Sequence, residues 1–145
     1  MTVATDILVD LWGGNRVLGR KIRNELDLIP LLREGLPYTT LEHLMAQFGL
    51  SREDVRNVLL LPSRTMTRRK QQQRLSGDES DRLYRLSRIM AHAVDVFGGR
   101  TRAADWMRRG NRALNGETPL SLLNTDIGAR QVDDVLGRIE HGVFG

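Results

Sequence analysis

Apolar residues recur at spacings of three and four along most of this chain, which is the period of helices with one buried face. The longest series runs from Leu83 to Phe97; it follows the capping sequence S-G-D-E at 76–79 and ends at a pair of glycines. Strictly alternating runs, the mark of half-buried strands, are absent. We therefore expect an all-α fold, with shorter helices at about 41–48 (Thr40 as N-cap), 51–61, 64–72, 101–109, 118–123 and 128–140.

The pattern is weaker over the first 36 residues. Ile7, Leu8 and Leu11 could line a short helix that Gly13 and Gly14 end, and from residue 15 helix and loop are expected, with Pro30 interrupting the series. We divide the chain into an N-terminal helical region, 1–75, which holds a helix-turn-helix at about 37–75, and a C-terminal region, 76–145. The second region consists of the long helix and a small helical domain. The apolar face of the long helix suits packing in the core or on a second copy of the chain.

The stretch 64–74, RTMTRRKQQQR, has five basic side chains and no acidic one. It follows the helix at 51–61 across Pro62 and Ser63, which is the arrangement of a helix-turn-helix whose second helix enters the major groove of DNA. A charged, solvated helix face is the alternative interpretation. If the stretch binds DNA, the side chains expected at phosphates and base edges are those of Ser63, Arg64, Thr65, Thr67, Arg68, Arg69 and Lys70.

A second register of the helix-turn-helix, with the turn at 49–51, also fits the apolar pattern. It would bring Arg52, Glu53 and Asp54 to the DNA, where two carboxylates would face phosphates, so we prefer the later register. One such unit binds weakly, and we expect a homodimer that reads two half-sites of operator DNA about 34 Å apart.

The 145 residues carry 22 Lys and Arg against 18 Asp and Glu, a net charge of +4 that favours an acidic partner such as nucleic acid. The chain has no cysteine, and its three histidines lack metal-ligand spacing. GGNRVLGRK (13–21) has the glycine spacing of a phosphate-binding loop, but Arg20 stands where that motif needs lysine. We therefore expect no catalytic residue, metal or cofactor, and a protein that acts by binding.

The first residues lack a basic leader, and no run of about 18 apolar residues could span a membrane. We expect a cytoplasmic protein.

From residue 50 onward the chain resembles the Xre/MbcA/ParS antitoxin family. The stretch RTMTRRKQQQRLSGDESDRLYRLSRI (64–89) is similar to the family's basic helix and the following R-L-S-x-x-E-S-D-R-L motif. The stretch WMRRGNRALNGETPLSLLNTDIGARQVDDVLGRIEHGVFG (106–145) is similar to its toxin-binding domain, with the Trp, the N-x-A-L, the T-P-L-x-L-L and the L-x-R-I-E-x-G-V of that domain in order.

The resemblance implies a type II antitoxin paired with a RES-domain toxin, an enzyme that consumes NAD. The C-terminal domain would cover the toxin's active site, and the helix-turn-helix would repress the shared operon. Two positions depart from the family, which commonly has a small residue within the first helix and Gly in the turn; Arg56 and Leu60 stand there. A stand-alone helix-turn-helix transcriptional regulator is the alternative function.

The last residues also suggest a partner-binding role. Gly142 ends the final helix, and apolar Val143 and Phe144 follow it, so Phe144 could fill a cleft of the partner or fold back on the core. The expected toxin-binding residues are Arg138, Glu140, His141, Gly142, Val143, Phe144 and Gly145.

Overall fold

The computed structural model describes residues 3–142, and the secondary structure in this range is helical. The elements are α1 (Val3–Leu11), α2 (Asn15–Leu18), η1 (Glu25–Asp27), α3 (Leu28–Glu34), α4 (Tyr38–Phe48), α5 (Arg52–Leu59), α6 (Ser63–Gln72), α7 (Gly77–Phe97), α8 (Arg100–Met107), η2 (Arg112–Leu114), η3 (Leu120–Leu122) and α9 (Asp126–Glu140), where η marks a 3₁₀ helix. Within 3–142 the only β pairing is an isolated bridge between Pro37 and Arg74. The predicted all-α fold is confirmed, with a helix-turn-helix region followed by a C-terminal domain.

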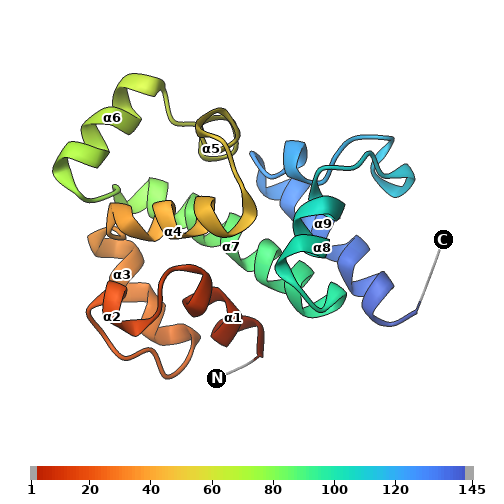
Figure 1. Ribbon diagram of the computed structural model, residues 1–145, viewed down its shortest axis with the longest axis horizontal. Helices are drawn as coiled ribbons and strands as arrows, with labels where there is room; N and C mark the ends of the chain where they lie inside the picture. The colour runs from red at the N-terminus through yellow and green to blue at the C-terminus, as the bar shows by residue number, and fades with distance from the viewer. Residues whose placement is uncertain (1–2, 143–145) are drawn as a thin grey trace.

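Helix α7 runs through the middle of the molecule and contacts elements of both halves (Figure 1). Helices α1, α3 and α5 pack on it from the N-terminal half, and α8 and α9 from the C-terminal half. Leu83, Leu86, Ile89 and Met90 are completely buried. The apolar face of the long helix therefore lies in the core, the first of the two roles that the sequence allowed.

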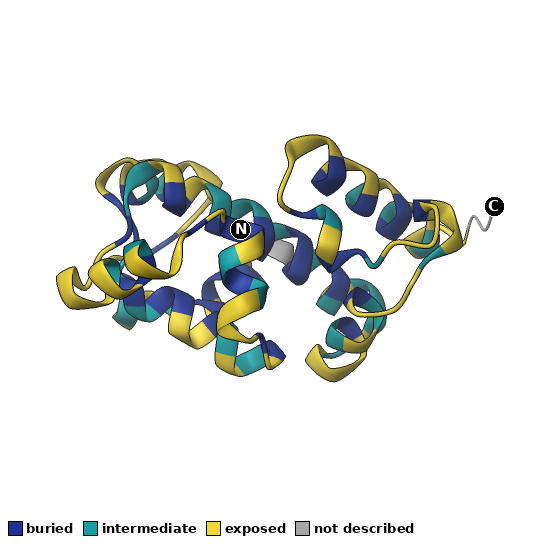
Figure 2. Cartoon of the chain, turned by 90° about the horizontal axis from the view of Figure 1, so that it is seen from above, coloured by how far each residue is buried: buried dark blue, intermediate teal, exposed yellow. Residues whose placement is uncertain are grey.

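Two buried hydrogen bonds attach the N-terminal half to α7. The indole Nε1 of Trp12, at the end of α1, donates to the Ser87 hydroxyl at 2.7 Å. The backbone N–H of Leu36 donates to the Ser80 hydroxyl at 2.7 Å. Because buried polar groups without partners are costly, these bonds specify where α1 and the α3–α4 link sit on α7. Figure 2 marks the buried residues along the helices in dark blue.

Two local expectations change in the structure. Pro30 lies inside the first turn of α3, where a missing N–H costs nothing, so it does not interrupt that helix. Thr40 is not an N-cap: α4 begins at Tyr38, after Pro37, and Thr40 is buried within the helix. The fixed φ of Pro37 suits the start of a helix, so α4 begins directly after it, earlier in the chain than expected.

Among residues 3–142, no helix is both long enough and apolar enough to cross a bilayer.

Candidate nucleic-acid interface and carboxyl-terminal groove

Helices α5 and α6, joined by residues 60–62, have the arrangement expected for the preferred register, while α4 and α5, joined by residues 49–51, have that of the other register. Ser51 caps α5 and forms a capping box with Asp54, in which each side chain accepts the other residue's backbone N–H. The link of residues 60–62 then turns the chain into α6, which starts after Pro62. On the inner side of α6, Met66 is buried in the core and holds the helix in place.

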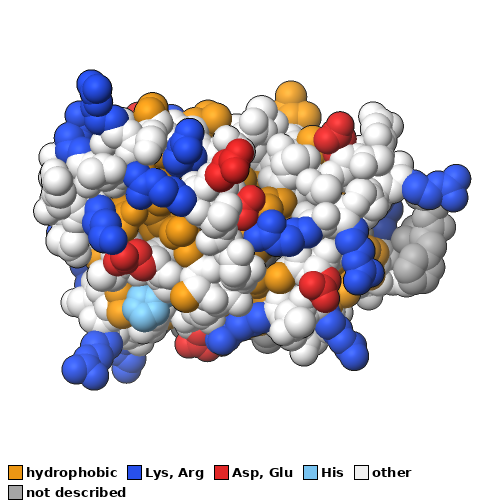
Figure 3. Space-filling model, turned by 45° about the horizontal axis from the view of Figure 1, so that its top comes forward, with side chains coloured by type: hydrophobic (Ala, Val, Ile, Leu, Met, Phe, Trp, Pro, Cys, Tyr) orange, Lys and Arg blue, Asp and Glu red, His pale blue; other side chains and the backbone are white. Residues whose placement is uncertain are grey.

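The outer face of α6 is polar, basic and exposed. Arg64, Thr67, Arg68 and Gln71 are all exposed, at the spacing of one helix face, and Ser63 is exposed at the first turn. Lys and Arg side chains protrude along the upper left of Figure 3, at the end of the molecule that carries α6 in Figure 1. Thr65 is less exposed than these residues: it is half-buried and lies at the side of this face.

Arg52, from the start of α5, joins this basic face. Its Nη2 donates to the Thr67 hydroxyl at 2.9 Å, to the Ser63 carbonyl at 3.1 Å and to the Ser63 hydroxyl at 3.4 Å. These bonds tie α5 to the first turn of α6 and add a cation beside it. The sequence placed Arg52 at the DNA only in the other register, and Gln71 was not expected. Helical spacing from Arg64 would have found Gln71.

Arg69 has a different environment from Arg68. Its Nε donates to Glu79 Oε1 at 2.7 Å, and its Nη1 donates to Gln72 Oε1 at 3.1 Å. The ion pair is largely buried, with side-chain exposures of 20% for Arg69 and 7% for Glu79. The Arg69 guanidinium is thus held against the start of α7. Lys70, by contrast, is exposed, with its Nζ 4.0 Å from Glu42 Oε2.

Both departures from the family pattern have a visible structural consequence. Leu60, at the position where the resemblance implies Gly, adopts the left-handed conformation with φ of 55°, and the residue is 52% exposed. This conformation is strained for a residue with a Cβ. Arg56 is half-buried, and its Nε has no hydrogen-bond partner among residues 3–142. With these two residues in place, α5 and α6 form on either side of the turn.

The C-terminal domain is built on α9, which Thr125 caps through a hydrogen bond from the Gly128 N–H. Val132, Val135 and Leu136 face the core. A Cβ added at Gly128 would collide with the Leu122 carbonyl, so the glycine allows η3 to lie directly on α9.

A groove of about 680 Å³ lies along the last turns of α9 and is lined by polar side chains. His92 of α7 stands in it, with Nδ1 2.7 Å from Asp133 Oδ1 and Nε2 3.4 Å from Glu140 Oε1. Of the expected toxin-binding residues, Arg138 and His141 line the groove, Glu140 contacts His92, and Gly142 follows the end of α9. Val143, Phe144 and Gly145 lie outside the described residues.

Within residues 3–142 no cluster of three or more His, Cys, Asp or Glu residues is arranged to hold a metal ion. The fold and the basic face define a helix-turn-helix protein with an appended helical domain. Two family models match the chain: the antitoxin Xre-like helix-turn-helix domain over residues 27–88, and the antitoxin Xre/MbcA/ParS C-terminal toxin-binding domain over residues 92–142.

Individual relatives agree with the family models. The chain is 36% identical to an antitoxin Xre of Photorhabdus laumondii, across 92% of this chain and 89% of the relative. It is 33% identical to an antitoxin Xre of Yersinia enterocolitica, across 92% and 90%. A Prs ADP-ribosylating antitoxin of a Sphingobium species is 26% identical, across 82% and 81%. The chain belongs to the Xre/MbcA/ParS antitoxin family.

Proposed function

We propose that this protein is the antitoxin of a type II pair, which neutralises a RES-type, NAD-consuming toxin through its C-terminal domain and represses its own operon through α6. The observation that carries the proposal is the order of its two parts, a basic helix-turn-helix followed by a toxin-binding domain. The protein would work in the cytoplasm by binding alone, with no cofactor and no chemical step of its own.

The DNA-binding part of the proposal depends on the outer face of α6. Arg64 and Arg68 are exposed there, and Lys70 lies at its edge. Arg52 is hydrogen-bonded to Ser63 and Thr67, so its positive charge lies beside this face and makes it an additional candidate for phosphate contact. Because Arg69 is bound to Glu79, we assign it to the fold instead of the DNA. Thr65 remains a candidate at the edge of the face.

The salt dependence of operator binding tests this assignment. Arg64→Ala with Arg68→Ala should weaken binding and reduce the slope of log affinity against log salt by about 1 for each phosphate that the variant no longer neutralises. Arg102→Ala with Arg112→Ala is the control, since it removes the same charge from exposed positions of the C-terminal domain. Equal slopes for the two double variants would exclude α6 as the DNA-binding helix.

The toxin-binding part depends on the end of α9 and the residues beyond it. The groove beside Arg138 and His141 is concave and mixes both charges, which suits a polar partner surface. An apolar anchor at Phe144 would add contact next to it. The relative named for Prs ADP-ribosylation favours an NAD-consuming partner, because ADP-ribosyl groups are transferred from NAD.

Deletion of residues 142–145 separates the antitoxin from a stand-alone regulator. We expect the truncated protein to bind operator DNA as before while the toxin regains NAD-consuming activity. Full inhibition by the truncated protein would exclude the tail as the blocking element. A full-length chain that binds the operator but no protein encoded beside it would support the regulator.

We further propose that the working form is a homodimer joined through the exposed face of η1 and α3. Leu26 and Ile29, 71% and 40% exposed, are two of the four large apolar side chains exposed within residues 3–142. A hollow of about 410 Å³, lined by Ile29 of this pair, is flanked by Arg33 on one side and by Asp78 and Asp81 on the other. A two-fold arrangement would place Arg33 of one copy opposite the two carboxylates of the other.

Leu26→Glu should convert the dimer to a monomer in light scattering and weaken operator binding more than tenfold. Ile127→Glu is the matched control, because Ile127 is 74% exposed and lies in α9 instead. A dimer that survives Leu26→Glu at the same concentration would place the interface elsewhere.

A further inference from the structure

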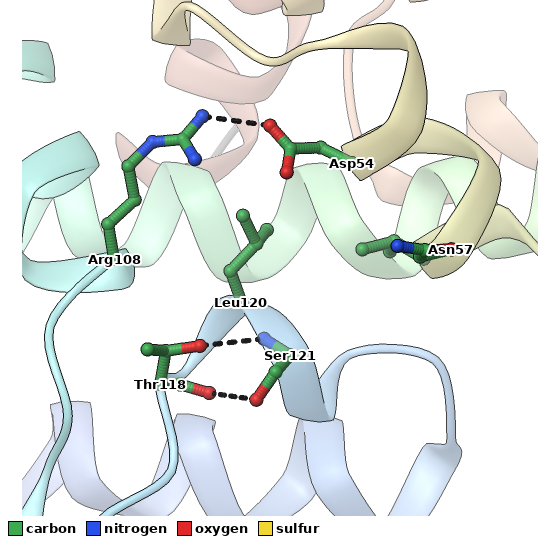
Figure 4. Close-up of a pocket in the computed structure, with 7 residues that line it drawn as sticks. Asp54, Asn57, Arg108, Thr118, Leu120 and Ser121 are labelled. Atoms are coloured by element: carbon green, nitrogen blue, oxygen red, sulfur yellow. Dashed lines mark hydrogen bonds and ion pairs between the residues drawn. The ribbon is translucent and has the colours of Figure 1, made fainter.

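Arg108, at the end of α8, makes polar contacts between the C-terminal domain and the helix-turn-helix, where α8 packs on α4 and η3 packs on α5. Its Nη2 donates to the Asp54 carboxylate at 2.9 Å and to the Gly49 carbonyl at 3.0 Å (Figure 4 shows the ion pair). Both acceptors flank the short turn between α4 and α5. Arg108 therefore links the C-terminal domain to the first helix of the helix-turn-helix.

Both acceptors are also held by structure that does not involve Arg108. Gly49 ends α4 in the left-handed conformation. Asp54 Oδ2 also accepts the backbone N–H of Ser51 at 2.9 Å, as part of the capping box of α5. Burial alone would raise the pKa of Asp54, but the hydrogen bonds from Ser51 and Arg108 outweigh it and lower the pKa. Asp54 thus stays ionised, and the position of Arg108 is tied to the position of α5.

A small groove of about 250 Å³ lies beside this ion pair, between the two parts of the chain. Asn57 and Val58 of α5 line one wall, and Thr118, Leu120 and Ser121 line the other. The second wall belongs to the segment 112–123, inside the region matched by the toxin-binding family model. A partner that displaces this segment would therefore act directly on α5.

The contact continues from α5 to the proposed DNA-binding helix. Arg52, in the first turn of α5, is hydrogen-bonded to Ser63 and Thr67 of α6. A change in the position of α5 is thus transmitted to the basic face. Because Arg108 and Asp54 are 42% and 24% exposed, their ion pair contributes little to overall stability and can open without unfolding the protein.

We propose that Arg108 is a positioning residue that couples toxin binding at the C-terminal domain to operator affinity at α6. This inference rests on the proposed function, since it needs both binding activities. The coupling is measured as the ratio of operator affinities with and without saturating toxin.

The experiment uses the full-length chain, a duplex of its own promoter region and the purified product of the adjacent gene. For the wild type we expect the toxin to change operator affinity at least fivefold. Arg108→Ala should bring this ratio at least threefold closer to one, while Arg109→Ala, which removes the same charge from an exposed neighbouring position, leaves it unchanged. Arg108→Lys keeps the charge but offers a single ammonium group, so its ratio should be intermediate.

Equal ratios for Arg108→Ala, Arg109→Ala and the wild type would overturn the inference, as would a wild-type ratio of one. In both cases operator binding and toxin binding would persist, so the proposed function would stand. Loss of the proposed function itself gives a different result: no operator binding by the wild type, or no complex with the toxin. Unfolding midpoints of the variants, measured alongside, exclude a general loss of structure.

Discussion

Arg69 and Glu79 form a largely buried ion pair that joins the end of α6 to the beginning of α7. The Arg69 Nε lies 2.7 Å from Glu79 Oε1, and the same oxygen accepts the backbone N–H of Ser76 at 2.8 Å. Burial on its own would raise the pKa of Glu79, but the hydrogen bonds from Arg69 and Ser76 outweigh it, and the pKa lies below its ordinary value. The hydrogen bond with Glu79 in turn raises the pKa of Arg69.

This pair predicts a loss of stability in acid. A carboxyl group whose pKa is lower in the folded state stabilises the fold above its unfolded pKa of about 4.3, and the stabilisation disappears as the pH falls through the folded value. At pH 7 Glu79→Gln should lower the free energy of unfolding by about 1–3 kcal/mol, and the difference from wild type should shrink below about pH 4.

Urea unfolding between pH 7 and pH 3 measures this difference. Arg68→Ala is the control, because Arg68 is exposed one residue away from Arg69 and should leave the pH profile unchanged. A Glu79→Gln profile parallel to that of the wild type at every pH would contradict the assignment of the acid-sensitive step to Glu79.

In the turn of the helix-turn-helix, one substitution is expected to raise the free energy of unfolding. Leu60 is left-handed and 52% exposed, so Leu60→Gly removes backbone strain and gives up little burial. We expect the free energy of unfolding to rise by about 0.5–1 kcal/mol, since the flexibility that Gly adds to the unfolded chain offsets part of the gain.

Leu61→Gly, at the next position, is the contrasting variant. Leu61 is 3% exposed, and loss of its side chain should cost more than about 2 kcal/mol. Denaturant unfolding of both variants distinguishes strain from packing. If Leu60→Gly were also destabilised by more than about 1 kcal/mol, the side chain of Leu60 would have a packing role that its exposure does not indicate.

The helices that were predicted best have both a capping signal and a long apolar series. The pairs predicted as helix starts, Ser76 with Glu79 and Ser51 with Asp54, form capping boxes in the structure. Local signals failed at Thr40, where the preceding proline sets the helix start, and in the first 36 residues they found only the short helix before Gly13 and Gly14. There α1 is held by Trp12, whose partner Ser87 is 75 positions away. Such a contact depends on the tertiary fold and leaves no local pattern.

The same limit applies to the basic face. The charge run at 64–74 identified the helix, but it does not distinguish Arg68, which faces solvent, from Arg69, which is held by Glu79. Helical spacing separates the two only after the buried side of α6 is known from Met66. Arg52 and Arg108 act through partners 15 and 54 positions away, so their roles emerge only from the structure.

The packing of η3 on α9 gives the last prediction, which compares two glycines of one helix. A side chain at Gly128 would meet the Leu122 carbonyl, whereas no neighbouring atom lies within 4 Å of a Cβ built at Gly137. Gly128→Ala should therefore separate η3 from α9 and cost about 1–3 kcal/mol or more, while Gly137→Ala should stabilise the helix by about 0.5–1 kcal/mol. Thermal unfolding of the two variants gives the comparison. Because η3 also lines the groove beside Asp54, Gly128→Ala should in addition weaken the coupling between toxin binding and operator affinity. Equal stability and equal coupling in both variants would show that η3 does not need its close approach to α9.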